Sequence, residues 1–237
     1  MTRRWYATCA APGPSSASER RATDLTRLPG GGFRVGTPRG SVSATHVLVA
    51  TNGYTTGLVP AIQRRVVPVG SYLIATEPLE PALARTLSPR GRMFFDTKNF
   101  LYYWRLLEDH RMVFGGRASF APTTIARARD WLYRAMLRVH PQLGGVRVTH
   151  AWGGRLGFSL DRMPHIGRID GITYALAYCG TGVAMATAFG RQAAAFISGE
   201  PLPPFLTMDF PPVPLYRGTP WFLPAVGLYY QWRDATT

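Results

Sequence analysis

The sequence contains very little lysine and few acidic residues. Lys98 is the only lysine among 27 basic residues, which outnumber 13 acidic residues and give a formal net charge of +14. A charge of this size raises nucleic acid as a partner. However, the arginines are scattered, without a run of five or six and without a basic stripe at helical spacing. We therefore expect an ordinary, basic surface and no nucleic-acid partner.

Cysteine and long apolar runs are also scarce. Cys9 and Cys179 are the only 2 cysteines and lie far apart, so neither a disulfide framework nor metal-ligand spacing is indicated. This usage suits a reducing compartment, and we expect a cytoplasmic protein. No run of about 18 apolar residues occurs, so no transmembrane helix is expected. The N-terminus also lacks the continuous apolar core of a signal peptide.

What is present indicates a globular chain. Hydrophobic residues make up 46% and charged residues 17% of 237 residues, and 25 glycines with 20 prolines predict many turns. Residues 1–21 are rich in Pro, Ser and Ala and are expected to form a disordered arm. The proline-rich, aromatic segment 201–237 is expected to be irregular.

The pattern of apolar residues predicts an α/β fold of mixed (α+β) type. His46–Ala50 is almost entirely apolar, as in a strand buried on both faces of a parallel sheet. A second strand is predicted over residues 67–79, and Phe100–Leu107 with Met112–Gly115 predicts an aromatic hairpin. Thr123–Val139 has the periodicity of an amphipathic helix. Residues 146–152 predict a strand, and residues 153–171 predict a looped segment.

The segment "ITYALAYCGTGVAMATAFGRQAAAFISGE" (172–200) predicts a strand, a Gly180-Thr181-Gly182 turn and a helix over Val183–Ser198. A helix N-terminus binds anions, and glycine allows a ligand to approach closely. The turn does not match a dinucleotide fingerprint, because Met185 occupies the sixth position and no G-x-G-x-x-G occurs elsewhere. Taken alone, the motif also fits a tight strand-to-helix turn in any α/β protein.

Three stretches together resemble the D-amino-acid-oxidase-like FAD-dependent oxidoreductases. They are "VLVATNGYT" (47–55), "HAWGGRLGFSLDRMPHIGRI" (150–169) and "YCGTGVAMATAFGRQAA" (178–194). The resemblance extends over residues 22–237, and it is greatest to the branch that includes γ-glutamylputrescine oxidase and sarcosine oxidase. It implies the C-terminal part of that fold, without the N-terminal Rossmann βαβ unit.

The resemblance also implies a division into domains. Residues 22–66 and 151–200 would belong to an incomplete FAD-binding domain, and residues 67–150 would form a mostly antiparallel substrate domain with a covering helix. The implied cofactor is FAD. The implied activity is oxidation of the C–N bond of an amine or N-substituted amino acid by hydride transfer to flavin. The alternative is a non-catalytic remnant of the family that binds no flavin.

The resemblance assigns cofactor-binding residues to several segments. The amides of Thr181, Gly182 and Val183, following Gly180, would face the electron-rich edge of the isoalloxazine ring. Trp152 with Gly153 is a further candidate, or a core tryptophan beside a bulge. Asp161 either contacts the cofactor or caps local backbone amides. Thr51-Asn52-Gly53 either lies at the cofactor or is a strand-ending turn.

Substrate-binding candidates come from the aromatic hairpin. Tyr103 and Arg105 alternate onto one face, and Arg117 follows the partner strand. Arginine can bind a carboxylate through two hydrogen bonds, and tyrosine rings can line an amine pocket. The alternative is a solvated outer face of the sheet.

No catalytic residue is assigned from the sequence. Sarcosine-oxidase-like relatives use a lysine on the second hairpin strand to activate O2, and Val113 is the nearest equivalent here, while Lys98 is expected to be exposed. The electron acceptor is therefore O2 or another acceptor. His150 and His165 could move a proton or could be hydrogen-bonded structural residues.

Overall fold

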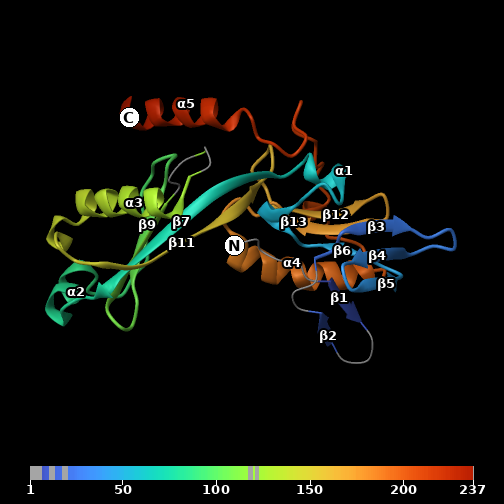
Figure 1. Ribbon diagram of the computed structural model, residues 1–237, viewed down its shortest axis with the longest axis horizontal. Helices are drawn as coiled ribbons and strands as arrows, with labels where there is room; N and C mark the ends of the chain where they lie inside the picture. The colour runs from blue at the N-terminus through green and yellow to red at the C-terminus, as the bar shows by residue number, and fades with distance from the viewer. Residues whose placement is uncertain (1–6, 11–13, 18–20, 117–119, 121–122, 237) are drawn as a thin grey trace. The chain divides into compact units, whose positions relative to one another are not determined.

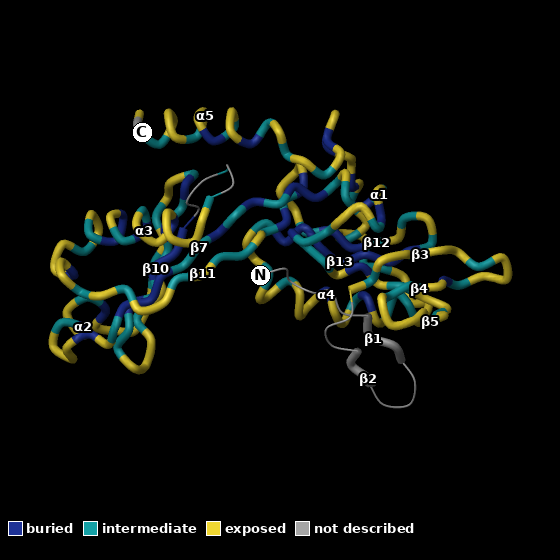
Figure 2. The backbone as a smooth tube through the Cα atoms, viewed as in Figure 1, coloured by how far each residue is buried: buried dark blue, intermediate teal, exposed yellow. Residues whose placement is uncertain are grey.

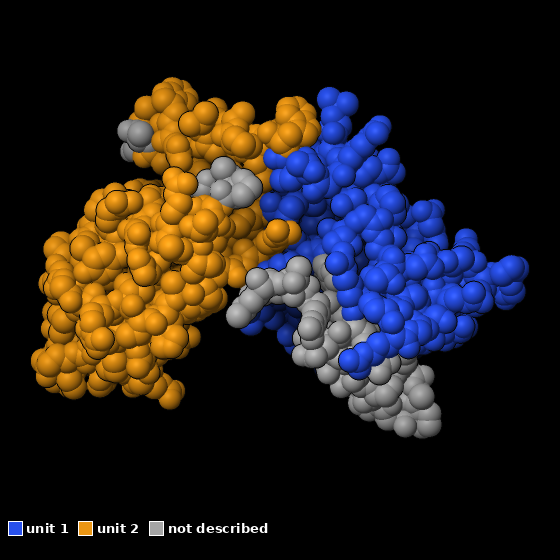
Figure 3. Space-filling model, viewed as in Figure 1, with its two compact units in different colours: residues 1–68, 156–220 blue, residues 69–155, 221–237 orange. Residues whose placement is uncertain are grey.

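The computed structural model describes residues 7–10, 14–17, 21–116, 120 and 123–236 (Figure 1). The chain forms two compact units, coloured separately in Figure 3. Unit 1 comprises residues 1–68 and 156–220, and unit 2 comprises residues 69–155 and 221–237. Each unit is built from segments that are distant in sequence.

Unit 1 is built on a three-stranded sheet with the order β12 (His165–Ile169), β13 (Ile172–Leu176), β6 (Leu48–Val49). β12 and β13 are antiparallel, whereas β13 and β6 are parallel. All five residues of β13 are buried, as expected for the central strand of a sheet covered on both faces (Figure 2).

Two apolar clusters cover the faces of this sheet. One cluster packs Phe33, Val49, Ile62 and Tyr174 with Phe210, and the other includes Ile166, Tyr178 and Phe189. The second cluster contains α4 (Gly182–Ile197), in which only Phe189 and Ala193 are fully buried. The remaining elements of unit 1 are an antiparallel meander, a short hairpin and short helices: β3 (Asp24–Arg27), β4 (Phe33–Thr37), β5 (Gly40–Ala44), β1 (Ala7–Ala10), β2 (Pro14–Ala17), η1 (Asn52–Tyr54), α1 (Pro60–Gln63) and η3 (Pro204–Leu206).

Unit 2 is built on a five-stranded sheet with the order β11-β7-β10-β9-β8. The helix α3 (Ile125–Val139) packs Leu132, Ala135 and Met136 against Phe114 and Ile74 of this sheet. Thr124 caps α3, because its side chain accepts a hydrogen bond from the Arg127 amide. The elements of unit 2 are β7 (Val67–Pro78), α2 (Pro81–Leu87), β8 (Phe94–Phe95), β9 (Tyr102–Leu106), β10 (Arg111–Gly116), η2 (Pro141–Leu143), β11 (Val148–Phe158) and α5 (Leu223–Thr236). The first two residues of β7 and the last three of β11 belong to unit 1.

The mixed α/β fold, the aromatic hairpin, the helix after residue 123 and the glycine-turn helix are confirmed within a residue or two. Two expectations about loops are wrong. Residues 153–171 are not a loop throughout, because β11 continues to Phe158 and β12 follows. The segment 201–237 is not irregular throughout, because residues 223–236 form α5. In both cases turn-forming residues are accommodated inside regular structure.

Two further expectations need correction. The strand predicted over His46–Ala50 is only two residues long, and Leu48 is 41% exposed, so it is not buried on both faces. Part of the expected disordered arm over residues 1–21 forms the antiparallel pair β1–β2. Residues 1–6, 11–13 and 18–20 of that arm lie outside the described residues.

Candidate functional site

The strand-to-helix corner between β13 and α4 is the first candidate site. Its backbone is unusual, because Ala177, Cys179 and Gly180 have φ values of 61°, 52° and 110°. Hydrogen bonds hold this conformation: both the amide and the hydroxyl of Thr181 donate to the Tyr178 carbonyl oxygen, at 2.9 and 2.7 Å. The Thr181 amide is therefore already engaged inside the turn, unlike the sequence-based expectation that it would be available to a ligand.

The next amides begin α4 and have a different environment. No side chain caps the helix, and Met185 is the first residue whose amide donates to the helix backbone, at 3.1 Å from the Thr181 carbonyl oxygen. The amides of Gly182, Val183 and Ala184 are thus the free donors that a helix start leaves, with its partial positive charge. Val183 is 95% exposed, and no atom lies within 4 Å of the position that a Cβ would take at Gly180. This corner fits an electron-rich group.

Asn52 holds the corner to the end of β6. Its side-chain oxygen accepts hydrogen bonds from the amides of Ala177 and Tyr178 at 3.0 and 3.4 Å. Asn52 has φ 44°, a left-handed conformation that asparagine tolerates. Gly157 of β11 completes the cluster, since its carbonyl oxygen accepts from the Cys179 amide at 3.0 Å. A Cβ at Gly157 would collide with the Asn52 side-chain oxygen and lie 2.9 Å from the Gly53 amide nitrogen.

Thr51 and Gly53 serve the same turn. The Thr51 and Thr55 hydroxyls are 2.7 Å apart, and the Thr55 hydroxyl donates to the Asn52 carbonyl oxygen at 2.8 Å. Gly53 is buried. These contacts are those of a strand-ending turn. The hydrogen bonds of Asn52 also position the backbone of the glycine corner.

Asp161 and His165 form a local pair at the start of β12. The Asp161 carboxylate accepts from the Met163 amide and from the His165 ring, both at 3.0 Å. His165 is buried and stacks on Phe210 with ring centroids 4.1 Å apart. Partial burial acts to raise the pKa of Asp161, but the hydrogen bonds from His165 and Met163 outweigh it and hold the pKa below its usual value. Asp161 therefore accepts hydrogen bonds from local donors.

The second candidate site is one face of the sheet in unit 2. Tyr103 and Arg105 of β9 pair with Gly115 and Val113 of β10, so all four residues lie on the same face. The Tyr103 ring covers Gly115, where an added Cβ would lie 2.5 Å from the ring. The Tyr103 hydroxyl lies 3.1 Å from the hydroxyl of the buried Ser71 in β7. Arg105 is exposed.

Gly153 and Trp152 of β11 belong to this unit as well. A Cβ at Gly153 would lie 2.6 Å from the Tyr72 ring, so the glycine is needed for that ring to pack. Trp152 is 41% exposed, which excludes the alternative of a core tryptophan. Arg117, the third substrate-binding candidate, lies outside the described residues.

The remaining candidates have ordinary surroundings. Val113 is half-buried on β10, and Lys98 is exposed, as expected. His150 is exposed, and its Nδ1 lies 2.9 Å from the Thr149 hydroxyl. Among the described residues, no group of three or more His, Cys, Asp or Glu side chains could hold a metal ion. None of the helices in the described ranges is long and apolar enough to cross a membrane.

Sequence reasoning missed Ser71 and Gly157. Ser71 sits in an otherwise apolar strand, and its polar side chain at a buried position was the only available signal. Gly157 follows Leu156 within a segment that was interpreted as a loop. A glycine inside a strand indicates a close approach of another backbone, but only once the segment is recognised as a strand.

Comparison with known proteins decides the family. Residues 2–196 match the sequence model of DAO, the FAD dependent oxidoreductase family. The chain belongs to this family. The family is FAD-dependent, so the expected family and cofactor are confirmed. The curated relatives described next are matched over only part of their length, which is consistent with the expected C-terminal portion.

Curated relatives of the family include gamma-glutamylputrescine oxidoreductase of Escherichia coli, which is 34% identical over 205 residues. That alignment covers 84% of this chain and 48% of the relative. The probable oxidoreductase OrdL of Haemophilus influenzae is 36% identical over 175 residues, covering 72% of this chain and 40% of the relative. The chain thus spans about half the length of the curated relatives that it matches.

Solved structures with a similar fold are also found. L-proline dehydrogenase from P. horikoshii has a TM-score of 0.62 at 18% identity, covering 78% of this chain and 51% of that one. Glycine oxidase from Bacillus cereus has a TM-score of 0.63 at 18% identity, covering 80% of this chain and 53% of that one. At these identities the likeness establishes the fold alone.

Proposed function

We propose that this chain supplies the flavin-edge corner and the substrate-side sheet of an enzyme that oxidises the C–N bond of an amine or N-substituted amino acid. The flavin of such an enzyme accepts a hydride from the substrate. The observation that carries the proposal is the open corner at Gly180–Val183, found in a chain that matches the FAD-dependent family. The named activity of the E. coli relative supports an amine as substrate.

The residues of the corner would act on charge. The amides of Gly182 and Val183 would donate to the electron-rich edge of the ring, where negative charge accumulates on reduction. A hydrogen bond to a charged group is worth about 1.5–3 kcal/mol, and the helix dipole adds about 0.3–1 kcal/mol. Asn52 would keep these amides in place by fixing the preceding turn at Ala177 and Tyr178.

The face of the unit 2 sheet would orient the substrate. The Tyr103 and Ser71 hydroxyls form a neutral pair that can donate to and accept from an amine or a carboxylate. Arg105 lies on the same face and is a candidate partner for a carboxylate. Val113 is uncharged at the position where sarcosine-oxidase-like relatives have the lysine that activates O2, and Arg105, which pairs with it across the strands, is assigned to the substrate in this proposal. We propose a dehydrogenase-type acceptor for this reason.

The phosphate groups of FAD require a further binding segment. No G-x-G-x-x-G occurs in this sequence, and the matched relatives are about twice as long as the aligned region, with 48% coverage for the E. coli protein. We infer that residues outside this sequence hold the pyrophosphate and that this chain alone binds FAD weakly. The same two observations favour the second candidate, a non-catalytic remnant that binds no flavin.

Titration of the purified chain with riboflavin, FMN and FAD separates these possibilities. If the chain contacts only the ring system, the three ligands will bind with affinities that agree within about threefold, or about 0.7 kcal/mol. FAD binding more than about tenfold tighter than riboflavin would show that this chain holds the phosphates itself. Absence of binding by all three ligands would support the non-catalytic remnant and contradict the proposal.

A further inference from the structure

The helix α5 is held to unit 2 by one face. Leu223 and Gly227 are buried on that face, and the Tyr230 ring contacts the Phe120 ring with centroids 6.2 Å apart. At the end of the helix, the Asp234 carboxylate accepts hydrogen bonds from the amides of Asn99 and Phe100, both at 2.9 Å, and from the Asn99 side chain at 2.8 Å. The orientation of α5 on the unit is therefore fixed.

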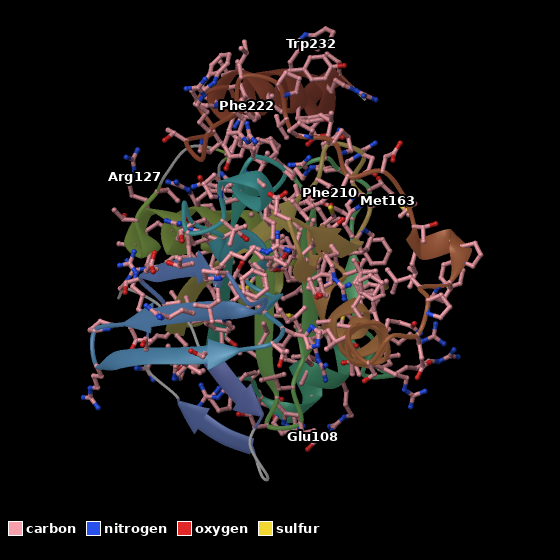
Figure 4. All side chains as sticks on the ribbon, turned by 90° about the vertical axis from the view of Figure 1, so that its right-hand side faces the viewer. Glu108, Arg127, Met163, Phe210, Phe222 and Trp232 are labelled. Carbon is pink, nitrogen blue, oxygen red and sulfur yellow. The ribbon has the colours of Figure 1, made fainter. Side chains whose placement is uncertain are left out.

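The opposite face of α5 is apolar and exposed. Leu228, Tyr229 and Trp232 are 69%, 52% and 63% exposed, and Trp221, just before the helix, is 63% exposed. In Figure 4, the Trp232 side chain is labelled beside this helix at the top of the view. With Ala225, these residues follow helical spacing and form one stripe, here called the α5 stripe. The match to the family model ends at residue 196, before this helix.

The charged residues next to the α5 stripe in the sequence are mostly arginines. The run from Trp221 to Trp232 contains no charged residue, and Arg217 and Arg233 flank it in the sequence. Asp234 is the only acidic residue after Asp209, and its carboxylate accepts hydrogen bonds from the amides of Asn99 and Phe100. The chain as a whole has a formal net charge of +14. A partner that complements this surface is anionic and accepts aromatic side chains.

The size of the α5 stripe disfavours a second copy of the chain as its partner. Buried aromatic side chains cover about 150–250 Å² each, so three partly exposed ones with Leu228 offer roughly 400–500 Å². A stable protein interface needs about 800 Å² on each partner. A lipid surface needs no complementary shape, and tryptophan and tyrosine are the side chains that favour the boundary between lipid and water.

We propose that the α5 stripe docks this protein on the surface of an anionic lipid bilayer, with the helix lying in the plane of the headgroups. At 14 residues α5 is too short to span the bilayer, which takes about 20. Leu228, Tyr229 and the two tryptophans enter the boundary between headgroups and acyl chains. Arginines of the basic surface contact the lipid phosphates.

Co-sedimentation of the full chain with vesicles tests this proposal. Vesicles of phosphatidylcholine mixed with phosphatidylglycerol should bind the wild-type chain more tightly than vesicles of phosphatidylcholine alone. The double variant Leu228→Ala/Trp232→Ala should weaken binding to the mixed vesicles by at least about tenfold. Phe95→Ala, at a side chain that is 73% exposed on β8 of the same unit, is the matched control and should bind as wild type.

Salt separates docking by the stripe from attraction of a basic protein to any anionic surface. High salt weakens binding of every variant, but the gap between wild type and the double variant should persist, because it arises from apolar contacts. Equal binding by wild type and the double variant overturns the proposal, and so does an equal loss in Phe95→Ala. Self-association that the double variant abolishes, without a difference on vesicles, also overturns it and assigns the stripe to a second copy. Far-UV circular dichroism of each variant verifies that it is folded.

Discussion

Glycines in the two candidate sites lack a side chain for opposite reasons. At the corner of unit 1, nothing lies within 4 Å of the space that a Cβ would take at Gly180, and Gly182 has only ordinary contacts with Tyr178. In the unit 2 sheet, tyrosine rings already occupy that space above Gly115 and Gly153. The first arrangement leaves a surface open to a ligand, whereas the second packs a strand.

This difference shows which glycines report function. A filled glycine is explained by its neighbour, so no ligand is needed to account for it. An open glycine at a helix start, next to unbonded amides, has no such steric explanation, although the φ of 110° at Gly180 itself favours glycine. Gly157 is the instructive third case, because it lies beside the corner and yet is filled by Asn52 and Gly53. Substitutions at open and filled positions should therefore have different consequences.

Gly157→Ala should have the largest effect on stability. The added Cβ meets the Asn52 side chain and the Gly53 backbone, which cannot move without breaking the turn. We expect a loss of about 3 kcal/mol in the free energy of unfolding, measured by urea denaturation. A loss smaller than about 0.5 kcal/mol would mean that the corner is loosely packed.

Asn52→Ala should be the next most damaging change. It removes the acceptor for the Ala177 and Tyr178 amides and places alanine at φ 44°. Unpaired donors and backbone strain should together cost about 2 kcal/mol. Asn52→Asp is the control, because aspartate keeps an acceptor and tolerates this conformation. Equal losses in the two variants would exclude the hydrogen bonds as the cause.

Gly115→Ala should destabilise unit 2 by about 1–2 kcal/mol, through the collision with the Tyr103 ring. The same change in a Tyr103→Ala background should cost almost nothing, because the ring is gone. Unfolding free energies of the two single variants and the double variant give the coupling directly. Additive losses at Gly115 and Tyr103 would contradict the packing argument.

Gly190→Ala, on α4 with no atom within 4 Å of its Cβ position, should instead stabilise the protein by up to about 1 kcal/mol in the free energy of unfolding.

Periodicity and turn chemistry were sufficient to predict the hairpin, α3 and α4 because these elements have strong local signals. β12 and α5 were missed because Gly167 in one and Pro224 with Gly227 in the other are normally read as breakers. Gly167 is tolerated because Tyr174 covers it, with the hydroxyl oxygen 2.7 Å and the ring 3.0 Å from the Cβ position, and Gly227 because it packs on Phe120. The hydrogen bonds of Asn52 could not be predicted from the sequence, since its partners lie 125 and 126 residues away.

Acid should weaken the Asp161–His165 pair, with a small effect on the whole protein. The pKa of Asp161 is lowered in the folded chain, so its contribution is complete above the unfolded value of about 4 and is lost as pH falls through the folded value. The difference in unfolding free energy between wild type and Asp161→Asn should therefore shrink below about pH 4. A difference that grows on acidification would contradict this sign.

The most direct measurement is riboflavin affinity of Gly182→Asp beside that of wild type. An aspartate at the first residue of α4 favours the helix through its dipole, and the Cβ makes only a 3.7 Å contact with Tyr178. The free energy of unfolding should stay within about 0.5 kcal/mol of wild type, while riboflavin binding weakens by at least about tenfold. Unchanged riboflavin affinity in this folded variant would contradict a flavin edge at the Gly180–Val183 corner.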